Sequence, residues 1–135
     1  QILIHCGDIT DPAVAKEMNG FKVIHVLGNC DVDAEGIKHA LLSCDTNNIS
    51  QDQYTGSIER VQFAVIHGDD PTKLQQLIAS GNYHFVFHGH THRRRDETIG
   101  FSRVINPGAL GGQDVLSRSF CILDLASGYI RFLEV

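Results

Sequence analysis

The sequence predicts an α/β protein in which β-sheets pack together and helices cover them from outside. Through the first two-thirds of the 135 residues, apolar strand-like runs alternate with segments of helical periodicity. The last third changes to short apolar runs separated by tight turns, which is typical of hairpins. Because no repeat, low-complexity tract or linker interrupts the chain, we expect a single domain over residues 1–135.

Local signals place the individual elements. Asp11 followed by Pro12 is typical of a helix N-cap and first helical position, and Pro71 opens another helix in the same way. Residues 43–53 are polar and are expected to form a loop. Strands are expected at about 2–5, 21–27, 54–58, 61–66, 85–87, 94–98, 101–105, 120–125 and 129–133, and helices at about 12–18, 32–42 and 71–79.

Composition and charge exclude several classes of function. The net charge of −5 argues against a nucleic-acid-binding protein, which would usually carry a basic face. No apolar run approaches the roughly 20 residues that span a bilayer, and no signal-peptide pattern is present. The four cysteines lack C-x-x-C spacing and are interpreted as reduced thiols. We therefore expect a cytoplasmic protein that does not act on membranes.

Four apolar runs, residues 2–5, 23–27, 63–66 and 85–87, end at or just before a glycine that is accompanied by a polar side chain able to bind a metal. The metal-capable side chains at these ends are Asp8, Asn29, His67, His90 and His92. Oxygen and imidazole donors without thiolate suit Mn²⁺, Fe or Zn²⁺ at an open catalytic site better than a closed structural zinc site. A carboxylate among them could bridge two metals about 3.5–4 Å apart, an arrangement that supports displacement at phosphorus.

The order of these motifs resembles one known family. The motifs are Gly7-Asp8, Gly28-Asn29-Cys30-Asp31, His67-Gly68, Gly89-His90-Thr91-His92 and Asn106-Pro107-Gly108. They are similar to those of the calcineurin-like metallophosphoesterases, and most similar to the small single-domain bacterial and archaeal phosphodiesterases of that superfamily. The resemblance runs through nearly the whole chain.

The resemblance implies a four-layer α-β-β-α sandwich with two divalent metals, Mn²⁺ being expected and Ni, Fe or Zn being alternatives. Asp8 would bridge both metals, with Asn29, His67 and His90 completing one and His92 binding the other. A hydroxide activated by the two metals would attack a phosphodiester or phosphomonoester, while Asn29 and His90 stabilise the transition state. Asp31 is expected to orient a ligand rather than to bind metal, and no organic cofactor is expected.

Three departures from the family pattern matter. The family opens with a strand that ends in an Asp-x-His pair, and nothing before Gln1 supplies it, so the domain is expected to lack its N-terminal strand. Cys30 stands where many relatives have a histidine thought to protonate the leaving group. Asp69 stands where a histidine often follows the histidine–glycine pair. The identity of the leaving-group acid therefore stays open.

Structural interpretations compete with the functional ones. His5, His25 and His84 lie within strands and are expected to be structural, and the arginines at 93–95 are expected to be solvated. On the same fold, a protein-binding scaffold that resembles a retromer subunit is the alternative to an enzyme. The expected partner is a small phosphate-ester substrate whose identity the sequence leaves open. A homodimer through a sheet edge or the loop around Leu110 is also compatible with the sequence.

Overall fold

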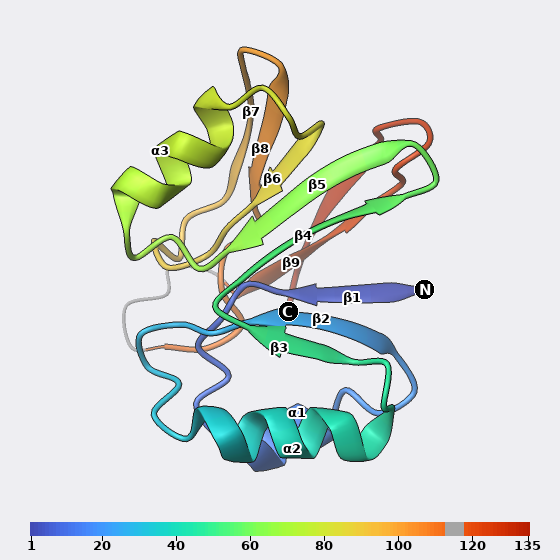
Figure 1. Ribbon diagram of the computed structural model, residues 1–135, viewed down its shortest axis with the longest axis vertical. Coiled ribbons are helices and arrows are strands. Elements are labelled where there is room, and N and C mark those ends of the chain that lie inside the picture. The colour runs from blue at the N-terminus through green and yellow to red at the C-terminus, as the bar shows by residue number, and fades with distance from the viewer. Residues whose placement is uncertain (113–117) are drawn as a thin grey trace.

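The computed structural model describes residues 1–112 and 118–135. Two β-sheets pack face to face, with α1 and α2 on the outside of one sheet and α3 on the outside of the other (Figure 1). The prediction of a four-layer α-β-β-α sandwich is therefore confirmed. The elements in chain order are β1 (Ile2–His5), α1 (Pro12–Lys16), β2 (Lys22–Val26), α2 (Ala34–Cys44), β3 (Ile49–Gln51), β4 (Gln53–Ile58), β5 (Val61–Ile66), α3 (Pro71–Ala79), β6 (Phe85–Phe87), β7 (Arg95–Ile99), β8 (Ser102–Asn106), β9 (Ser119–Leu123) and β10 (Ile130–Glu134).

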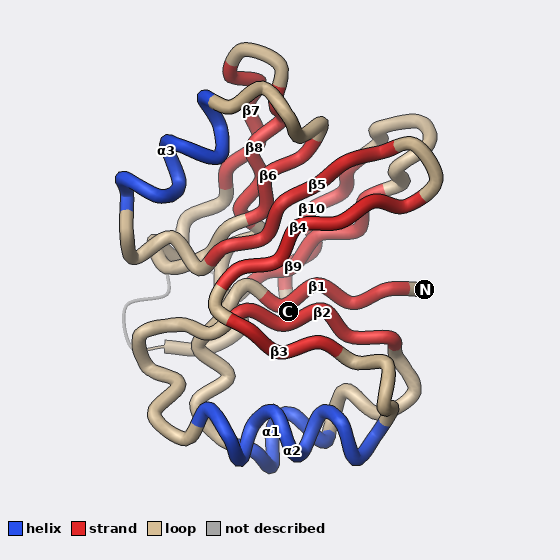
Figure 2. The backbone as a smooth tube through the Cα atoms, in the orientation of Figure 1, coloured by secondary structure: helices blue, strands red, loops and turns tan. Residues whose placement is uncertain are grey.

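The strands form two main sheets and a separate ribbon. The first sheet has the order β1-β2-β3 and is parallel throughout. The second has the order β4-β5-β6-β8-β7, in which β5, β6 and β8 are parallel and the two outer strands are antiparallel to their neighbours. β9 and β10 form an antiparallel ribbon behind the sheets (Figure 2).

Alternation along the buried strands divides the apolar side chains between layers. In β5, Phe63 and Val65 pack between the sheets, whereas Ala64 and Ile66 pack against α3. This alternation follows from the two-residue period of a strand that is covered on both faces. The core between the sheets contains Ile24, Val26, Phe63, Val65, Phe85, Phe87 and Ile105, and the core under α1 and α2 contains Ile9, Ala15, Val23, Ile37, Ala40 and Leu41.

We expect Phe63→Ala to lower the free energy of unfolding by about 3–5 kcal/mol, because the substitution leaves a cavity between the sheets. The Phe63 side chain is 1% exposed and contacts Tyr54 and Phe87 edge-on or at a tilt. Urea unfolding measures the change. Phe101→Ala is the matched control, because Phe101 is 56% exposed. Equal losses in the two variants would contradict this assignment of the core.

The structure differs from the sequence predictions at three places. The prediction of a loop over residues 43–53 was wrong in part, since β3 forms there by pairing with β2 through Ile24 and Ile49. A three-residue strand has no periodicity to detect, and its partner strand determines it. α1 ends at Lys16 rather than near residue 18, and α2 begins at Ala34 because the Asp33 side chain caps it by accepting from the N–H of Gly36.

The cysteines behave as small apolar residues. All four are free, and Cys6 and Cys121 pack against the core between the sheets. Burial raises the pKa of the Cys6 thiol to about 12 and that of Cys121 to about 11, so both stay protonated at neutral pH. Across residues 1–112 and 118–135, no helix has the length and apolar character that crossing a membrane requires.

Candidate metal centre

The loops that carry the predicted ligands meet at one edge of the sandwich. β1 and β2 are parallel, as are β5 and β6, and each is followed directly by one of these loops. Because parallel strands end on the same side of a sheet, the four loops come together where the two sheets face each other (Figure 2). The β-strands therefore bring together residues as far apart in sequence as Asp8 and His90.

Four donor atoms converge in this region, and we call Asp8, Asn29, His67 and His90 the four-donor cluster. Asn29 Oδ1 lies 3.1 Å from His67 Nε2 and 3.1 Å from His90 Nδ1. His67 Nε2 lies 3.3 Å from His90 Nδ1 and 3.3 Å from Asp8 Oδ2. The structure thus assembles four of the five predicted metal ligands around one point.

The hydrogen bonding of His67 leaves several acceptor atoms with their lone pairs directed at that point. His67 Nδ1 lies 2.6 Å from the carbonyl oxygen of Cys6, which can only accept, so Nδ1 carries the proton. In the neutral ring, Nε2 then presents a lone pair to the Asp8 carboxylate and to the Asn29 amide oxygen. Acceptors that face one another in this way are stabilised by a cation between them. A histidine that donates to a backbone carbonyl and ligates through its other nitrogen is a common arrangement at metal sites.

The spacing of the donors also fits a metal ion. Two ligands about 2.1–2.2 Å from an ion are about 3.0–3.1 Å apart at a right angle and about 3.4–3.6 Å apart at the tetrahedral angle. The measured separations of 3.1 and 3.3 Å lie in this range. Among the described residues, no three His, Cys, Asp and Glu side chains form a metal-binding group on their own. The amide oxygen of Asn29, 3.1 Å from a nitrogen of each histidine, supplies a further donor to the cluster.

Glycines let the loops approach this closely. A Cβ atom on Gly7 would lie 2.5 Å from His67 Nδ1, and the Gly7 φ of +97° disfavours any side chain. A Cβ atom on Gly28 would lie 2.1 Å from Asp8 Oδ1. The glycines that precede Asp8 and Asn29 in the motifs are thus required by close contact between the two loops.

Asp31 fixes the two loops of the first sheet. Its Oδ2 accepts hydrogen bonds from the N–H groups of Asp8 and Gly28 at 2.9 and 2.8 Å, and its Oδ1 accepts from that of Thr10 at 2.8 Å. Asp8 and Thr10 have φ values of 61° and 66°, a region that L-residues rarely adopt, so these bonds hold a strained turn. Burial favours a raised pKa for Asp31, but the three N–H groups outweigh burial and lower the pKa overall.

Two further histidines lie beneath these loops. His25 is fully buried, with Nδ1 2.9 Å from Ser50 Oγ and Nε2 3.4 Å from Asp31 Oδ2. The His5 ring lies 5.6 Å from that of His25, and His5 Nδ1 accepts a hydrogen bond from the N–H of Gly7. Both rings support the loops from below, in agreement with the structural role predicted for them. No sequence pattern indicated the hydrogen bond between Ser50 and His25.

We expect stability to fall as the pH is lowered from about 6.5 to about 4. Burial, and then the charge of His25, lowers the pKa of His5 to about 4, whereas an unfolded histidine has a pKa of about 6.5. The unfolded chain therefore binds a proton in this interval that the folded chain does not, which costs at most about 3 kcal/mol. Burial lowers the pKa values of His25 and His88 in the same direction. Urea unfolding of chelator-treated protein across this interval measures the effect. His5→Gln should reduce the dependence of the free energy of unfolding on pH, whereas His39→Gln, on the exposed surface of α2, should leave it unchanged.

Cys30 occupies the rim of the cluster. Its N–H donates to Asp8 Oδ1 at 2.9 Å, and its thiol is 3.4 Å from the amide nitrogen of Asn29. The negative charge of Asp8 raises the pKa of the Cys30 thiol, which keeps it protonated at neutral pH. The contact with the Cys30 thiol leaves the oxygen of Asn29 directed at the two histidines.

The remaining predicted residues lie around the cluster. His92 is half-buried on the same loop as His90, and no described contact joins it to the four-donor cluster. His88 is buried, and its Nε2 is 3.4 Å from Arg95. Arg95 also pairs with Glu97, and Arg94 pairs with Glu134 at 2.6 Å. These two arginines are therefore engaged in ion pairs, and Arg95 is half-buried.

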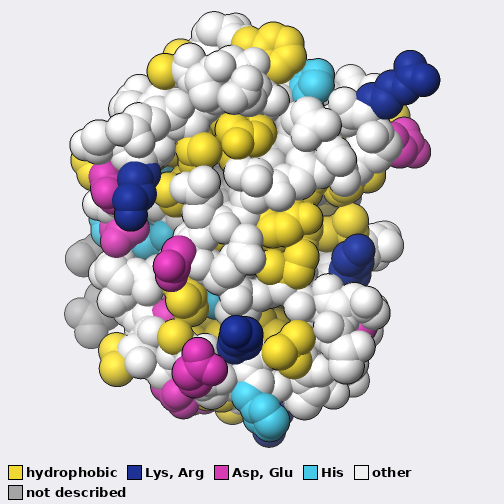
Figure 3. Space-filling model, in the orientation of Figure 1, with side chains coloured by type: hydrophobic (Ala, Val, Ile, Leu, Met, Phe, Trp, Pro, Cys, Tyr) yellow, Lys and Arg dark blue, Asp and Glu magenta, His cyan; other side chains and the backbone are white. Residues whose placement is uncertain are grey.

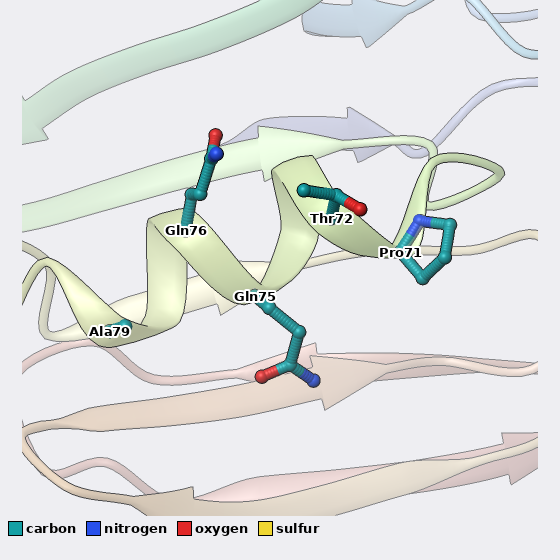
Figure 4. A pocket seen from close by; sticks show the side chains of 5 residues that line it. All are labelled: Pro71, Thr72, Gln75, Gln76 and Ala79. Carbon is teal, nitrogen blue, oxygen red and sulfur yellow. The ribbon is translucent and has the colours of Figure 1, made fainter.

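Other surface features offer weaker candidates for a functional site. A hollow on α3 is lined by Pro71, Thr72, Gln75, Gln76 and Ala79, none of which titrates (Figure 4). On the face seen in Figure 3, acidic and basic side chains are interspersed, and hydrophobic side chains gather between the two sheets. The edge of the sandwich that holds the four-donor cluster remains the candidate site.

Comparison with known proteins matches the chain to one family and to solved structures of the same fold. The family model of the calcineurin-like phosphoesterase superfamily domain matches residues 1–128. Phosphodiesterase MJ0936 of Methanocaldococcus jannaschii is 34% identical over 114 residues, which cover 83% of this chain and 69% of that protein. The solved structure of an archaeal phosphodiesterase superposes with a TM-score of 0.94 at 31% identity, covering 100% of this chain and 83% of that chain. Vacuolar protein sorting 29 from Cryptosporidium parvum shares the fold, with a TM-score of 0.64 at 20% identity over 96% of this chain and 78% of its own.

Proposed function

Because the chain belongs to the calcineurin-like phosphoesterase superfamily and is thus a hydrolase of phosphate esters, we propose that it cleaves phosphodiesters with divalent metal held at the four-donor cluster. The observation that supports the metal is the convergence of acceptor atoms around His67 Nε2. The similarity in sequence and in structure to proteins described as phosphodiesterases supports a diester substrate.

The donor set fits a divalent ion such as Mn²⁺, with Ni, Fe or Zn as alternatives. When bound, the ion supplies positive charge that polarises a phosphate ester and lowers the pKa of water. Positive charge matters here because the chain carries a net charge of −5 and its substrate is an anion.

The protein residues have distinct tasks in this proposal. His67, which is buried, and Asp8, which is half-buried, would hold the ion from the inner side of the cluster. Asn29 and His90 are exposed and would hold it from the open side, where His90 can reach a bound phosphate. Asp31 keeps the loops of Asp8 and Asn29 together and is a positioning residue. Cys30 is protonated on the rim, with its thiol 3.4 Å from the amide nitrogen of Asn29, and is a candidate proton donor to the leaving group.

A second metal is part of the proposal, with Asp8 as the bridging carboxylate and His92 as a ligand. The expectation that an Asp-x-His pair completes that second site stays a prediction. Calorimetric titration with Mn²⁺ gives the number of ions bound by each chain. Two tightly bound ions in these 135 residues would contradict the need for further ligands.

Hydrolysis of a chromogenic phosphodiester, with and without Mn²⁺, tests the proposed activity. We expect turnover that rises with Mn²⁺ and disappears when a chelator is added. A matching chromogenic phosphomonoester distinguishes the two substrate classes. Metal binding without hydrolysis of either ester under any divalent ion would favour the alternative, a protein-binding scaffold on the same fold.

A homodimer is a further part of the proposal. Leu110 is 55% exposed on the loop that follows β8, and an apolar side chain in that position suits a contact between two copies. Light scattering coupled to size exclusion measures the mass. Leu110→Ser should shift a dimer towards monomer, and a monomeric parent protein would contradict this part of the proposal.

A further inference from the structure

The histidine loop (residues 88–92) is held in an unfavourable backbone conformation. His90 and His92 have φ values of 62° and 56°, in the left-handed region that residues with a side chain rarely adopt. Such a conformation persists only where surrounding contacts determine it. Thr91 lies between the two histidines, so any group that fixes Thr91 restrains both.

Asn106 supplies these contacts from a neighbouring strand. It is fully buried at the end of β8. Its amide nitrogen donates to the carbonyl oxygen of Gly89 at 2.8 Å and to Thr91 Oγ1 at 3.1 Å. Its amide oxygen accepts from the N–H of Gly108 at 2.9 Å. Both hydrogens and the oxygen of this side chain are therefore engaged.

The strands make Asn106 a rigid support. Asn106 pairs with Arg95 in β7, and the preceding residue, Ile105, accepts a hydrogen bond from the N–H of His88 at 2.9 Å. The next residue of the same loop, Gly89, donates its N–H to the carbonyl oxygen of His67 at 2.9 Å. The histidine loop is thus attached to β8 and to the loop of His67.

We propose that Asn106 and Thr91 are a positioning pair that holds the His90 ring at the metal centre, an inference that rests on the proposed metal binding at the four-donor cluster. Neither side chain belongs to that cluster. Their hydrogen bond fixes the peptide on the C-terminal side of His90, while the bond to Gly89 fixes the peptide on its N-terminal side. His90 Nδ1 is thereby kept 3.1 Å from Asn29 Oδ1.

Thr91→Val tests the pair with little risk to folding, because Thr91 is exposed and valine keeps its shape while removing the acceptor. Thr91→Ser keeps the hydroxyl and serves as the rescue variant. Thr98→Val, on the exposed surface of β7, is the matched control. The measurements are Mn²⁺ affinity by calorimetry and the melting temperature of the metal-free protein.

We expect Thr91→Val to weaken Mn²⁺ binding by about 10–100-fold, the usual effect of removing a group that orients a ligand. Thr91→Ser and Thr98→Val should bind as the parent does, and all melting temperatures should stay close to that of the parent. A Mn²⁺ affinity of Thr91→Val within about twofold of the parent's would overturn the proposed positioning role of Asn106 and Thr91. So would an equal loss in Thr91→Ser, which would show that the hydroxyl is not responsible.

The parent protein separates this inference from the function on which it rests. If the parent binds no Mn²⁺, both the proposed metal centre and the positioning role of the pair are contradicted. If the parent binds Mn²⁺ and Thr91→Val binds equally well, the pair alone is wrong. Asn106→Asp gives a second measurement, because its carboxylate would face the Gly89 carbonyl in place of a donor, and we expect a loss of affinity at least as large.

Discussion

His90→Ala is expected to reduce Mn²⁺-stimulated phosphodiester hydrolysis by at least about a hundredfold, with stability unchanged. The His90 ring is exposed, so its removal leaves no cavity, yet its Nδ1 lies 3.1 Å from Asn29 Oδ1 and 3.3 Å from His67 Nε2. Without it, the cluster loses one of four donors and the group that faces the substrate.

Asn29→Ala should have an effect of similar size for a different reason. Its amide oxygen lies 3.1 Å from both His67 Nε2 and His90 Nδ1, so the alanine variant removes the oxygen ligand that lies between the two imidazoles. The steady-state rate of hydrolysis and the affinity for Mn²⁺ should decrease together in both variants. His39→Ala, on the exposed face of α2, is the matched histidine control. Unchanged turnover in either cluster variant would contradict the proposed function.

Asp31→Asn is expected to lower the free energy of unfolding by about 3 kcal/mol and to weaken metal binding at the same time. The two Asp31 oxygens accept three backbone N–H groups from two loops, and asparagine has only one acceptor oxygen. In either orientation of the amide, its NH₂ group would face at least one N–H donor. The loops of Asp8 and Asn29 would then separate.

Urea unfolding and Mn²⁺ calorimetry of the same Asp31→Asn preparation test this coupling. Asp52→Asn is the matched control, because Asp52 is exposed in the turn between β3 and β4. If Asp31→Asn folds as stably as the parent and binds Mn²⁺ equally well, Asp31 does not hold the loops. Loss of metal binding with full stability would make Asp31 a ligand instead of a positioning residue.

Much of the fold could be predicted because local chemistry and burial act in the same direction. Asp11-Pro12 and Asp70-Pro71 begin α1 and α3, with each aspartate accepting N–H groups of the first turn. The hairpin of β4 and β5 follows from two apolar runs with a turn between them. β3 could not be predicted, because it exists only through pairing with β2.

The sequence by itself determined which residue types could form the site, since Asp8, Asn29, His67 and His90 each follow an apolar strand in a fixed motif. Only the tertiary structure decided how they are held. Asp31 binds backbone N–H groups of two loops, and Asn106 supports a loop about 15 residues earlier in the chain. Hydrogen bonds between segments distant in sequence leave no periodicity or spacing to detect, because the packing of strands brings their partners together.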